Sequence, residues 1–191
     1  EQFGNKYPGI SLSVTTAQPD QITTAVADGQ TDIGITFTND SPKEVRVFAE
    51  KAAPFGLIML PDHPLAERMN VTIEDVTGYP LVRTIDARAG TSLLDQEMAA
   101  FALPMSTHIY TNALVIAKQA ILNNQVIGIY TKMGFMREIG RGELKFVKLT
   151  NQRLGKYKVG LLASATTSID PVKHLFISAA ERCMKLLNFD S

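Results

Sequence analysis

The sequence has little cysteine, no long apolar run and no excess of charge of one sign. Its single cysteine, Cys183, excludes an internal disulfide framework and a cysteine cage for a metal ion, and it favours a reducing cytoplasm. The longest apolar runs, such as residues 55–60, have six residues, whereas a membrane-spanning helix needs ~20. We therefore expect no membrane partner.

The charges balance, with 19 Lys and Arg against 19 Asp and Glu. A domain that held DNA through its own phosphate contacts would carry a basic excess or a basic stripe. The 191 residues, 45% apolar and 20% charged, suffice for one or two globular domains. The chain shows no signal-peptide pattern. Because it opens on Glu1 rather than Met, we expect a processed product or an excised piece.

Strands alternate with helices along the chain, which predicts an α/β fold with mostly parallel sheets. Residues 10–14, a helix from Pro19 and residues 32–37 are typical of a right-handed parallel crossover. Asp170 and Pro171 begin a final helix that carries Cys183 on its apolar face. The other expected strands are residues 45–50, 55–60, 80–84, 108–110, 126–130, 144–149 and 159–162, and two more helices are expected from residues 91 or 92 and 111 or 112.

Motifs that carry catalysis are absent. The histidines His63, His108 and His174 do not have zinc-site spacing, and His63 in its Asp-His-Pro turn is expected to be structural. The sequence contains neither a Gly-x-Ser-x-Gly elbow nor a glycine fingerprint for dinucleotides or triphosphates. We therefore expect no catalytic residue, no metal site and no cofactor.

Small polar residues stand instead where several expected strands end or helices begin, at residues 36–38, 90–92, 111–112 and 131–132. In open α/β sheets, ligands bind outside the carboxyl ends of strands, and helix N-termini there suit anions. The alternative is ordinary helix capping, which favours the same residue types. Convergence of these segments on one cleft would decide between the two interpretations.

Several motifs in this order resemble the regulatory domain of LysR-type transcriptional regulators, a bacterial family. The motifs are Phe3…Tyr7-Pro8-Gly9-Ile10-Ser11-Leu12, residues 26–35 (Val-Ala-Asp-Gly-Gln-Thr-Asp-Ile-Gly-Ile), residues 61–66 (Pro-Asp-His-Pro-Leu-Ala), Thr72-Ile73-Glu74-Asp75 and Tyr79-Pro80-Leu81-Val82. The resemblance covers nearly the whole chain. It implies an effector-binding domain with a two-lobed, type 2 periplasmic-binding-protein-like fold, whose lobes are joined by two crossover strands.

The resemblance also implies a domain organisation. The first subdomain would comprise residues 1–72 and 167–191, with its first strand missing, and the second residues 73–166. The N-terminal winged helix-turn-helix of the family is missing from this chain, so that DNA would be bound only through that domain.

Carried over by position, the resemblance implies a small, anionic effector in the cleft between the two subdomains. Either Arg83 or Arg88 can pair with a carboxylate, although a solvated loop arginine is the commoner case. Residues 131–132 are Thr-Lys where many relatives have a proline. The implied contacts are Thr36, Thr38, Thr84, Arg88, Gly90, Thr91, Ser92, Thr111, Asn112 and Thr131.

The implied function is ligand-controlled geometry, because an effector shifts the lobes to the extent that it prefers one arrangement. Dimers, or tetramers of the full-length protein, would transmit the shift to DNA-binding arms, with residues 19–28 and 113–123 at the interface. The main alternative is a periplasmic solute-binding protein of a transport system. An enzyme on a similar two-lobed fold would need a metal ligand set or a paired acid and base.

Overall fold

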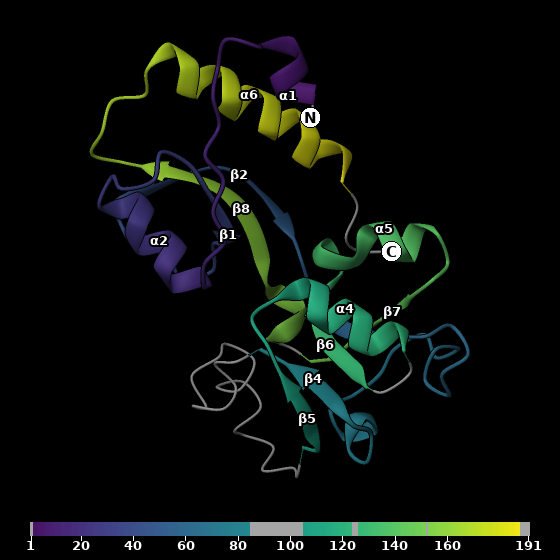
Figure 1. Ribbon diagram of the computed structural model, residues 1–191. Helices are drawn as coiled ribbons and strands as arrows, with labels where there is room; N and C mark the ends of the chain where they lie inside the picture. The colour runs from purple at the N-terminus through teal and green to yellow at the C-terminus, as the bar shows by residue number, and fades with distance from the viewer. Residues whose placement is uncertain (1, 85–104, 124–125, 152, 188–191) are drawn as a thin grey trace. The chain divides into compact units, whose positions relative to one another are not determined.

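A computed structural model describes residues 2–84, 105–123, 126–151 and 153–187 of the chain (Figure 1). These residues form two compact units. The first unit comprises residues 2–52 and 158–187, and the second comprises residues 53–157. Each unit is described by itself below.

The first unit is built on a three-stranded sheet with the order β1-β8-β2, in which β8 is antiparallel to both neighbours. Helices α2 and α6 lie on opposite sides of this sheet (Figure 1). Val26 of α2 packs against Val45 and Leu162 of the sheet, and all three are buried. The elements are α1 (Gln2–Lys6), α2 (Pro19–Ala27), β1 (Gly34–Phe37), β2 (Val45–Ala52), β8 (Lys158–Ser164) and α6 (Pro171–Leu186).

Helix α6 begins as the sequence predicts but buries a different face. The Asp170 carboxylate caps it, accepting a hydrogen bond from the Lys173 backbone N–H at 2.9 Å. Ile177 and Met184, seven residues apart and therefore on one side of the helix, are buried. Cys183 is exposed, so its predicted place on the apolar face is wrong. The buried stripe is narrow, and Cys183 lies one position away from it.

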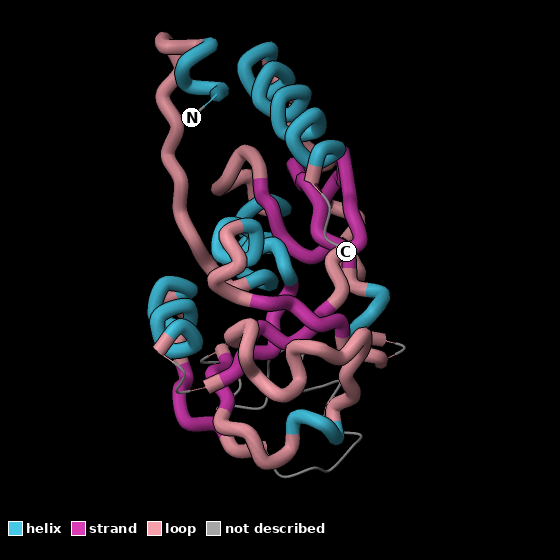
Figure 2. The backbone as a smooth tube through the Cα atoms, turned by 90° about the vertical axis from the view of Figure 1, so that its right-hand side faces the viewer, coloured by secondary structure: helices cyan, strands magenta, loops and turns pink. Residues whose placement is uncertain are grey.

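The strand predicted at residues 10–14 is also wrong. Residues 10–17 run as an extended stretch between α1 and α2 (Figure 2), and no described strand pairs with them. Leu12 is 51% exposed and Val14 is 84% exposed. Alternation of apolar and polar residues gives a strand only where a sheet edge accepts its backbone hydrogen bonds. The predicted parallel crossover from residues 10–14 to β1 is therefore not formed.

The second unit is built on a five-stranded mixed sheet with the order β5-β4-β6-β3-β7. Its strands are β3 (Phe55–Met59), β4 (Leu81–Arg83), β5 (Thr107–Tyr110), β6 (Ile127–Thr131) and β7 (Lys145–Lys148). The helices among its described residues are α4 (Leu114–Leu122) and α5 (Met136–Gly140), with single turns η1 (Glu74–Val76), η4 (Lys132–Phe135) and η5 (Leu154–Lys156). The inner face of α4 buries Ala117 and Ile121 against Val82 of β4, with Phe135 beside them.

The prediction of mostly parallel sheets is wrong in detail. Strand β4 is parallel to β5 and β6, but β3 is antiparallel to β6 and β7, and both pairings in the first unit are antiparallel. Strand β8 follows the second unit in the chain and lies between β1 and β2, running opposite to both. Pairings between such distant segments leave no mark on local periodicity.

The compact units change at residues 52/53 and 157/158, whereas the resemblance places the subdomain boundaries near residues 72 and 167. Strand β3 pairs with β6 and β7, which attaches residues 53–72 to the second unit. Residue Val71 also bridges to Leu149 in that unit. The assignment of the two units to the two subdomains of the family stays a prediction.

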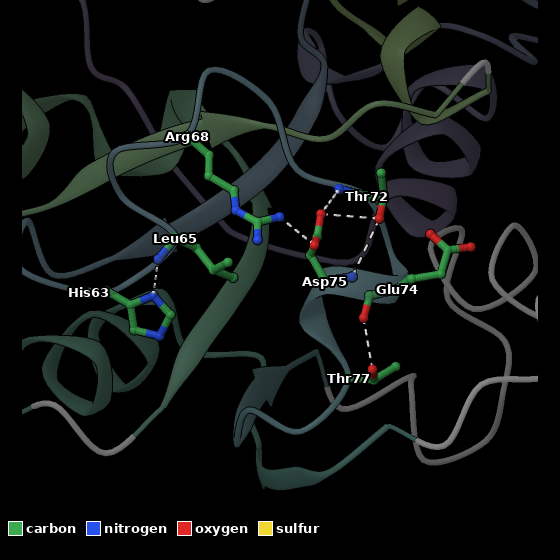
Figure 3. A network of polar contacts seen from close by, with 7 residues as sticks. All are labelled: His63, Leu65, Arg68, Thr72, Glu74, Asp75 and Thr77. Carbon is green, nitrogen blue, oxygen red and sulfur yellow. Dashed lines mark hydrogen bonds and ion pairs between the residues drawn. The ribbon is translucent and has the colours of Figure 1, made fainter.

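The turn that contains His63 is structural, as expected. The His63 Nδ1 atom accepts a hydrogen bond from the Leu65 backbone N–H at 3.2 Å (Figure 3). The imidazole ring also packs against the Tyr79 ring, with 4.7 Å between centroids. Burial lowers the pKa of His63, against the opposing charge of Asp62, which is consistent with the unprotonated Nδ1 that this turn needs.

Asp75 organises the next turn (Figure 3). Its carboxylate accepts hydrogen bonds from the Thr72 backbone N–H at 2.9 Å and from the Thr72 hydroxyl at 3.2 Å. The Asp75 N–H donates back to that hydroxyl at 3.4 Å, an arrangement like a capping box. Arg68 forms an ion pair with the same carboxylate. The Thr72 N–H contributes most to the lowered pKa of Asp75.

We expect Asp75→Asn to lower the free energy of unfolding by ~0.5–1 kcal/mol at pH 7, because amide oxygen replaces a carboxylate in a partly exposed network. The depressed pKa means that this stabilisation is complete above the ordinary value of 3.8 and is lost as pH falls through the lower folded value. Urea unfolding at several pH values checks this. Glu67→Gln, an exposed carboxylate of the same loop, serves as control. A difference that grows on acidification would contradict the assignment.

Candidate functional site

Three parallel strands of the second unit end at one edge of its sheet, and a threonine stands at or after each end. Strands β5, β4 and β6 are neighbours in that order, and the register places Arg83 opposite Tyr110. Thr84 follows β4, Thr111 follows β5, and Thr131 is the last residue of β6. The structure thus brings three of the predicted effector contacts to one edge, which we call the threonine edge (Thr84, Thr111 and Thr131).

Thr111 connects this edge to helix α4. Its backbone N–H donates to the Arg83 carbonyl oxygen at 3.0 Å, and its hydroxyl accepts from the Ala113 N–H at 3.0 Å. Ala113 is the N-cap residue, and its side chain cannot accept a hydrogen bond. The expectation that Thr111 or Asn112 caps α4 is therefore wrong by one or two residues, although the Thr111 hydroxyl still meets a backbone donor just before the helix.

Arg83 gives the threonine edge a buried positive charge. The residue is only 8% exposed. Burial lowers the pKa of Arg83, and the phenols of Tyr110 and Tyr130 act in the opposite direction. Burial likewise raises the pKa of Tyr130 to about 12, against the opposing effect of Arg83. The guanidinium stays protonated at neutral pH, so the electrostatics of this edge favour an anionic ligand.

Thr36 and Thr38 lie in the first unit, in β1 and directly after it, and both are buried. The Thr36 hydroxyl donates to the Pro19 carbonyl oxygen at 3.5 Å. The Thr38 hydroxyl donates to the Glu50 Oε2 atom at 3.2 Å. Both predicted contacts are therefore already hydrogen-bonded within the first unit.

Glu50 and Lys158 are candidate site residues that the sequence analysis missed. They form an ion pair beside Thr38, and the hydrogen bond from Lys158, against burial and together with that from Thr38, holds the pKa of Glu50 below its usual value. These residues are 108 positions apart and stand in strands of ordinary composition. Only the pairing of β2 with β8 brings them together.

The remaining predicted contacts are not tested by the geometry. Arg88, Gly90, Thr91 and Ser92 lie outside the described residues, and Asn112 is exposed. Within residues 2–84, 105–123, 126–151 and 153–187, no group of three or more His, Cys, Asp and Glu side chains is placed to hold a metal ion. In the same part of the chain, no helix is both long enough and apolar enough to cross a membrane.

Comparison with known proteins shows the family to which this chain belongs. The LysR substrate binding domain family matches residues 1–184. The chain belongs to this family. It is 34% identical over 121 residues to the transcriptional regulator CysB of Haemophilus influenzae, covering 61% of this chain and 36% of CysB. It is 22% identical over 180 residues to the regulator CysL of Bacillus subtilis, covering 93% of this chain and 59% of CysL. The chain spans about a third to three fifths of the length of these relatives.

Solved structures confirm the fold at lower identity. The regulatory domain of CcmR from Synechocystis PCC6803, in complex with 2-PG, superposes with a TM-score of 0.74 at 18% identity, covering 97% of this chain and 89% of that domain. The effector-binding domain of QuiR, in complex with shikimate, gives a TM-score of 0.70 at 15% identity, covering 96% of this chain and 87% of that domain. The predicted α/β, periplasmic-binding-protein-like fold class is therefore confirmed, with mixed sheets in place of mostly parallel ones.

The family membership also decides between the alternatives that the sequence left open. The matched family is the substrate-binding domain of LysR-type regulators, and both curated relatives are transcriptional regulators. A periplasmic transport protein and an enzyme are therefore disfavoured. The chain is a LysR substrate binding domain.

Proposed function

We propose that this domain senses a small anionic effector through the threonine edge of the second unit and through Thr36 and Thr38 of the first. The single observation that carries the proposal is the meeting of Thr84, Thr111 and Thr131 at the carboxyl ends of three adjacent parallel strands. Ligands of α/β proteins bind at such edges. The buried guanidinium of Arg83 at the same edge supports a negative charge on the ligand.

The test is a thermal-shift screen against sulfate, small dicarboxylates, aromatic carboxylates, amino-acid derivatives and sugars. A ligand at a hundred times its Kd adds ~2.7 kcal/mol to the stability of the folded state, which raises the Tm by roughly 5–10 °C for a chain of this size. We expect a carboxylate or another oxyanion to give this shift. We further expect Thr131→Val to remove most of it, because the substitution keeps the side-chain volume and deletes the hydroxyl.

Thr107→Val is the matched control for this substitution. Thr107 lies at the amino end of β5 in the same sheet, so its substitution makes the same chemical change at the opposite edge. We expect the ligand-induced shift of Thr107→Val to equal that of the wild type. A ligand whose stabilisation survives Thr131→Val, or a preference for neutral sugars over every anion, would overturn the proposal.

We also propose that the chain forms dimers through α4. Leu114, Val115 and Ile116 in the first turn of this helix are 39%, 66% and 51% exposed. Three consecutive exposed apolar side chains at one helix end are typical of an interaction surface. The family resemblance implies that residues 113–123 lie at the interface, and the exposure of these three side chains supports that assignment.

Sedimentation of the chain at high micromolar concentration tests the dimer. We expect Val115→Asp to weaken association at least ~100-fold, because a buried interfacial carboxylate without a partner costs several kcal/mol. Val172→Asp makes the same change at an exposed apolar residue, 46% exposed, in the first turn of α6 and should leave association unchanged. A wild-type chain that sediments only as a monomer would contradict the interface.

The wider role follows from the family. We propose that the complete protein is a cytoplasmic regulator that binds DNA through a domain outside this chain, and that effector binding alters the dimer that carries this domain. The relatives CysB and CysL are considerably longer than the matched segment, which leaves room for such a domain. The balanced charge of this chain is consistent with a sensor that does not itself contact phosphates.

A further inference from the structure

The Thr38 hydroxyl has one proton, and this proton already takes part in a hydrogen bond. It is donated to the Glu50 Oε2 atom at 3.2 Å, and a hydroxyl can donate only one hydrogen bond at a time. An effector that accepts a hydrogen bond from the Thr38 hydroxyl must therefore replace Glu50 as the acceptor of that bond. An anionic effector must in addition approach a carboxylate of the same sign.

We propose that Glu50 is an internal competitor for the effector contact of Thr38, and that it lowers the affinity of this site for oxyanions that only accept hydrogen bonds. The inference rests on the proposed function, because it assumes that Thr38 contacts the effector. It adds a residue that determines specificity: a ligand is favoured at Thr38 when it carries a donor for Glu50, and disfavoured when it presents negative oxygen atoms alone.

Lys158 makes this competition a coupled event. Its ammonium group forms the ion pair with Glu50, so an anion that displaces Glu50 from Thr38 comes close to a positive charge. The backbone of Lys158 is tied to the same loop. Its carbonyl oxygen accepts from the Thr38 N–H at 3.1 Å, and its N–H donates to the Asn39 side-chain oxygen at 2.9 Å. A change in the contacts of Thr38 therefore alters the contacts of Glu50 in β2 and of Lys158 in β8.

Lys158 is also the first residue of β8, where the chain returns to the first unit, and Glu50 lies near the end of β2, where the chain leaves it. The Thr38–Glu50–Lys158 cluster thus joins the predicted effector contact to both strands that connect the units. The exposed fractions of the Lys158 and Glu50 side chains are 50% and 40%. Both can change partners without breaking a buried core.

The experiment measures sulfate binding to the 191-residue chain by titration calorimetry at pH 7 and constant ionic strength. Sulfate is the probe because it carries no proton to donate at this pH. A freed hydroxyl that donates a hydrogen bond to an anion strengthens binding about tenfold. We expect Glu50→Ala to lower the Kd about tenfold, and Glu50→Gln to lower it less because the amide oxygen still accepts from Thr38.

Two further variants make the result specific. Glu44→Gln removes the same charge just before the opposite end of β2, and we expect it to leave the Kd within twofold of wild type. The double variant Glu50→Ala/Thr38→Val should lose the gain, because the freed hydroxyl is no longer present. Circular dichroism and the Tm of each variant without sulfate identify any loss of folding.

Each outcome of these titrations tests either the competition between Glu50 and the effector or the proposed function. A gain in Glu50→Ala that survives Thr38→Val would show that sulfate binds to the released Lys158 alone, and would overturn the competition. Sulfate binding that depends on Thr38 but not on Glu50 would overturn the inference and leave the proposed function standing. No sulfate binding in any variant, under conditions where the effector screen succeeds through Thr131, would overturn the inference alone. No binding in either experiment would overturn both.

Discussion

Gly56→Ala is expected to lower the free energy of unfolding by ~3 kcal/mol or more, because overpacking in a sheet interior is costly where backbone must move. Gly56 lies in β3, which is flanked by β6 on one side and β7 on the other. A Cβ atom at this position would lie 2.5 Å from the Val147 carbonyl oxygen and would overlap the Phe146 ring. The ring can turn, but the carbonyl belongs to the neighbouring strand and cannot move without disturbing its pairing.

The control for this substitution is Gly140→Ala. Gly140 is the last residue of α5, and a Cβ there would meet no atom within 4 Å. We expect the free energy of unfolding of this variant to equal that of the wild type or to exceed it by up to ~1 kcal/mol, because alanine restricts the backbone of the unfolded chain. Guanidinium unfolding followed by circular dichroism measures both. A Gly56→Ala variant within ~0.5 kcal/mol of wild type would show that the register of β3 with β7 is wrong, since only that register makes the contact.

Elements that begin at a capping residue, and strands whose buried residues are all apolar, could be predicted from the sequence. Asp170 followed by Pro171 predicts the start of α6 because the capping carboxylate and the fixed backbone angle of proline act within four residues. The buried residues of strands β3 and β6 are all apolar, so these strands can be predicted without knowing their partners. The prediction for residues 10–14 failed because a half-exposed strand depends on the edge that it meets.

The site residues also fall into those that could be predicted from the sequence and those that could not. Threonines at or directly after the ends of β4, β5 and β6 could be predicted because small polar residues at strand ends are visible locally. That these three ends meet depends on the parallel pairing of β4 with both neighbours, which adjacency in the sequence does not determine. Glu50 and Lys158 could not be predicted as partners of Thr38, because their proximity comes only from the long-range pairing of β2 with β8.

Gly160→Ala is expected to destabilise the first unit by ~2 kcal/mol and to displace Thr38. Gly160 of β8 stands opposite Thr36 on one side and Glu50 on the other. A Cβ there would overlap the Thr38 methyl group and would lie 2.8 Å from the Ala49 carbonyl oxygen. The glycine therefore provides the space in which Thr38 reaches Glu50, and alanine should weaken the effector contact as well as the fold.

Thr38→Ser tests whether the clash with the Thr38 methyl group causes both effects of Gly160→Ala. Serine keeps the hydroxyl and removes the methyl group that alanine at position 160 would overlap. Alone, it should cost ~0.8 kcal/mol for the lost methyl. In the double variant Gly160→Ala/Thr38→Ser, we expect the total loss of stability to be ~1 kcal/mol smaller than the sum of the two single losses. This difference is within the range for residues in contact. A double-mutant cycle by urea unfolding measures this coupling. Additivity to within ~0.3 kcal/mol would show that Thr38 does not pack over Gly160, whereas the expected coupling would show that the Thr38 methyl group packs there, as the contact with Glu50 requires.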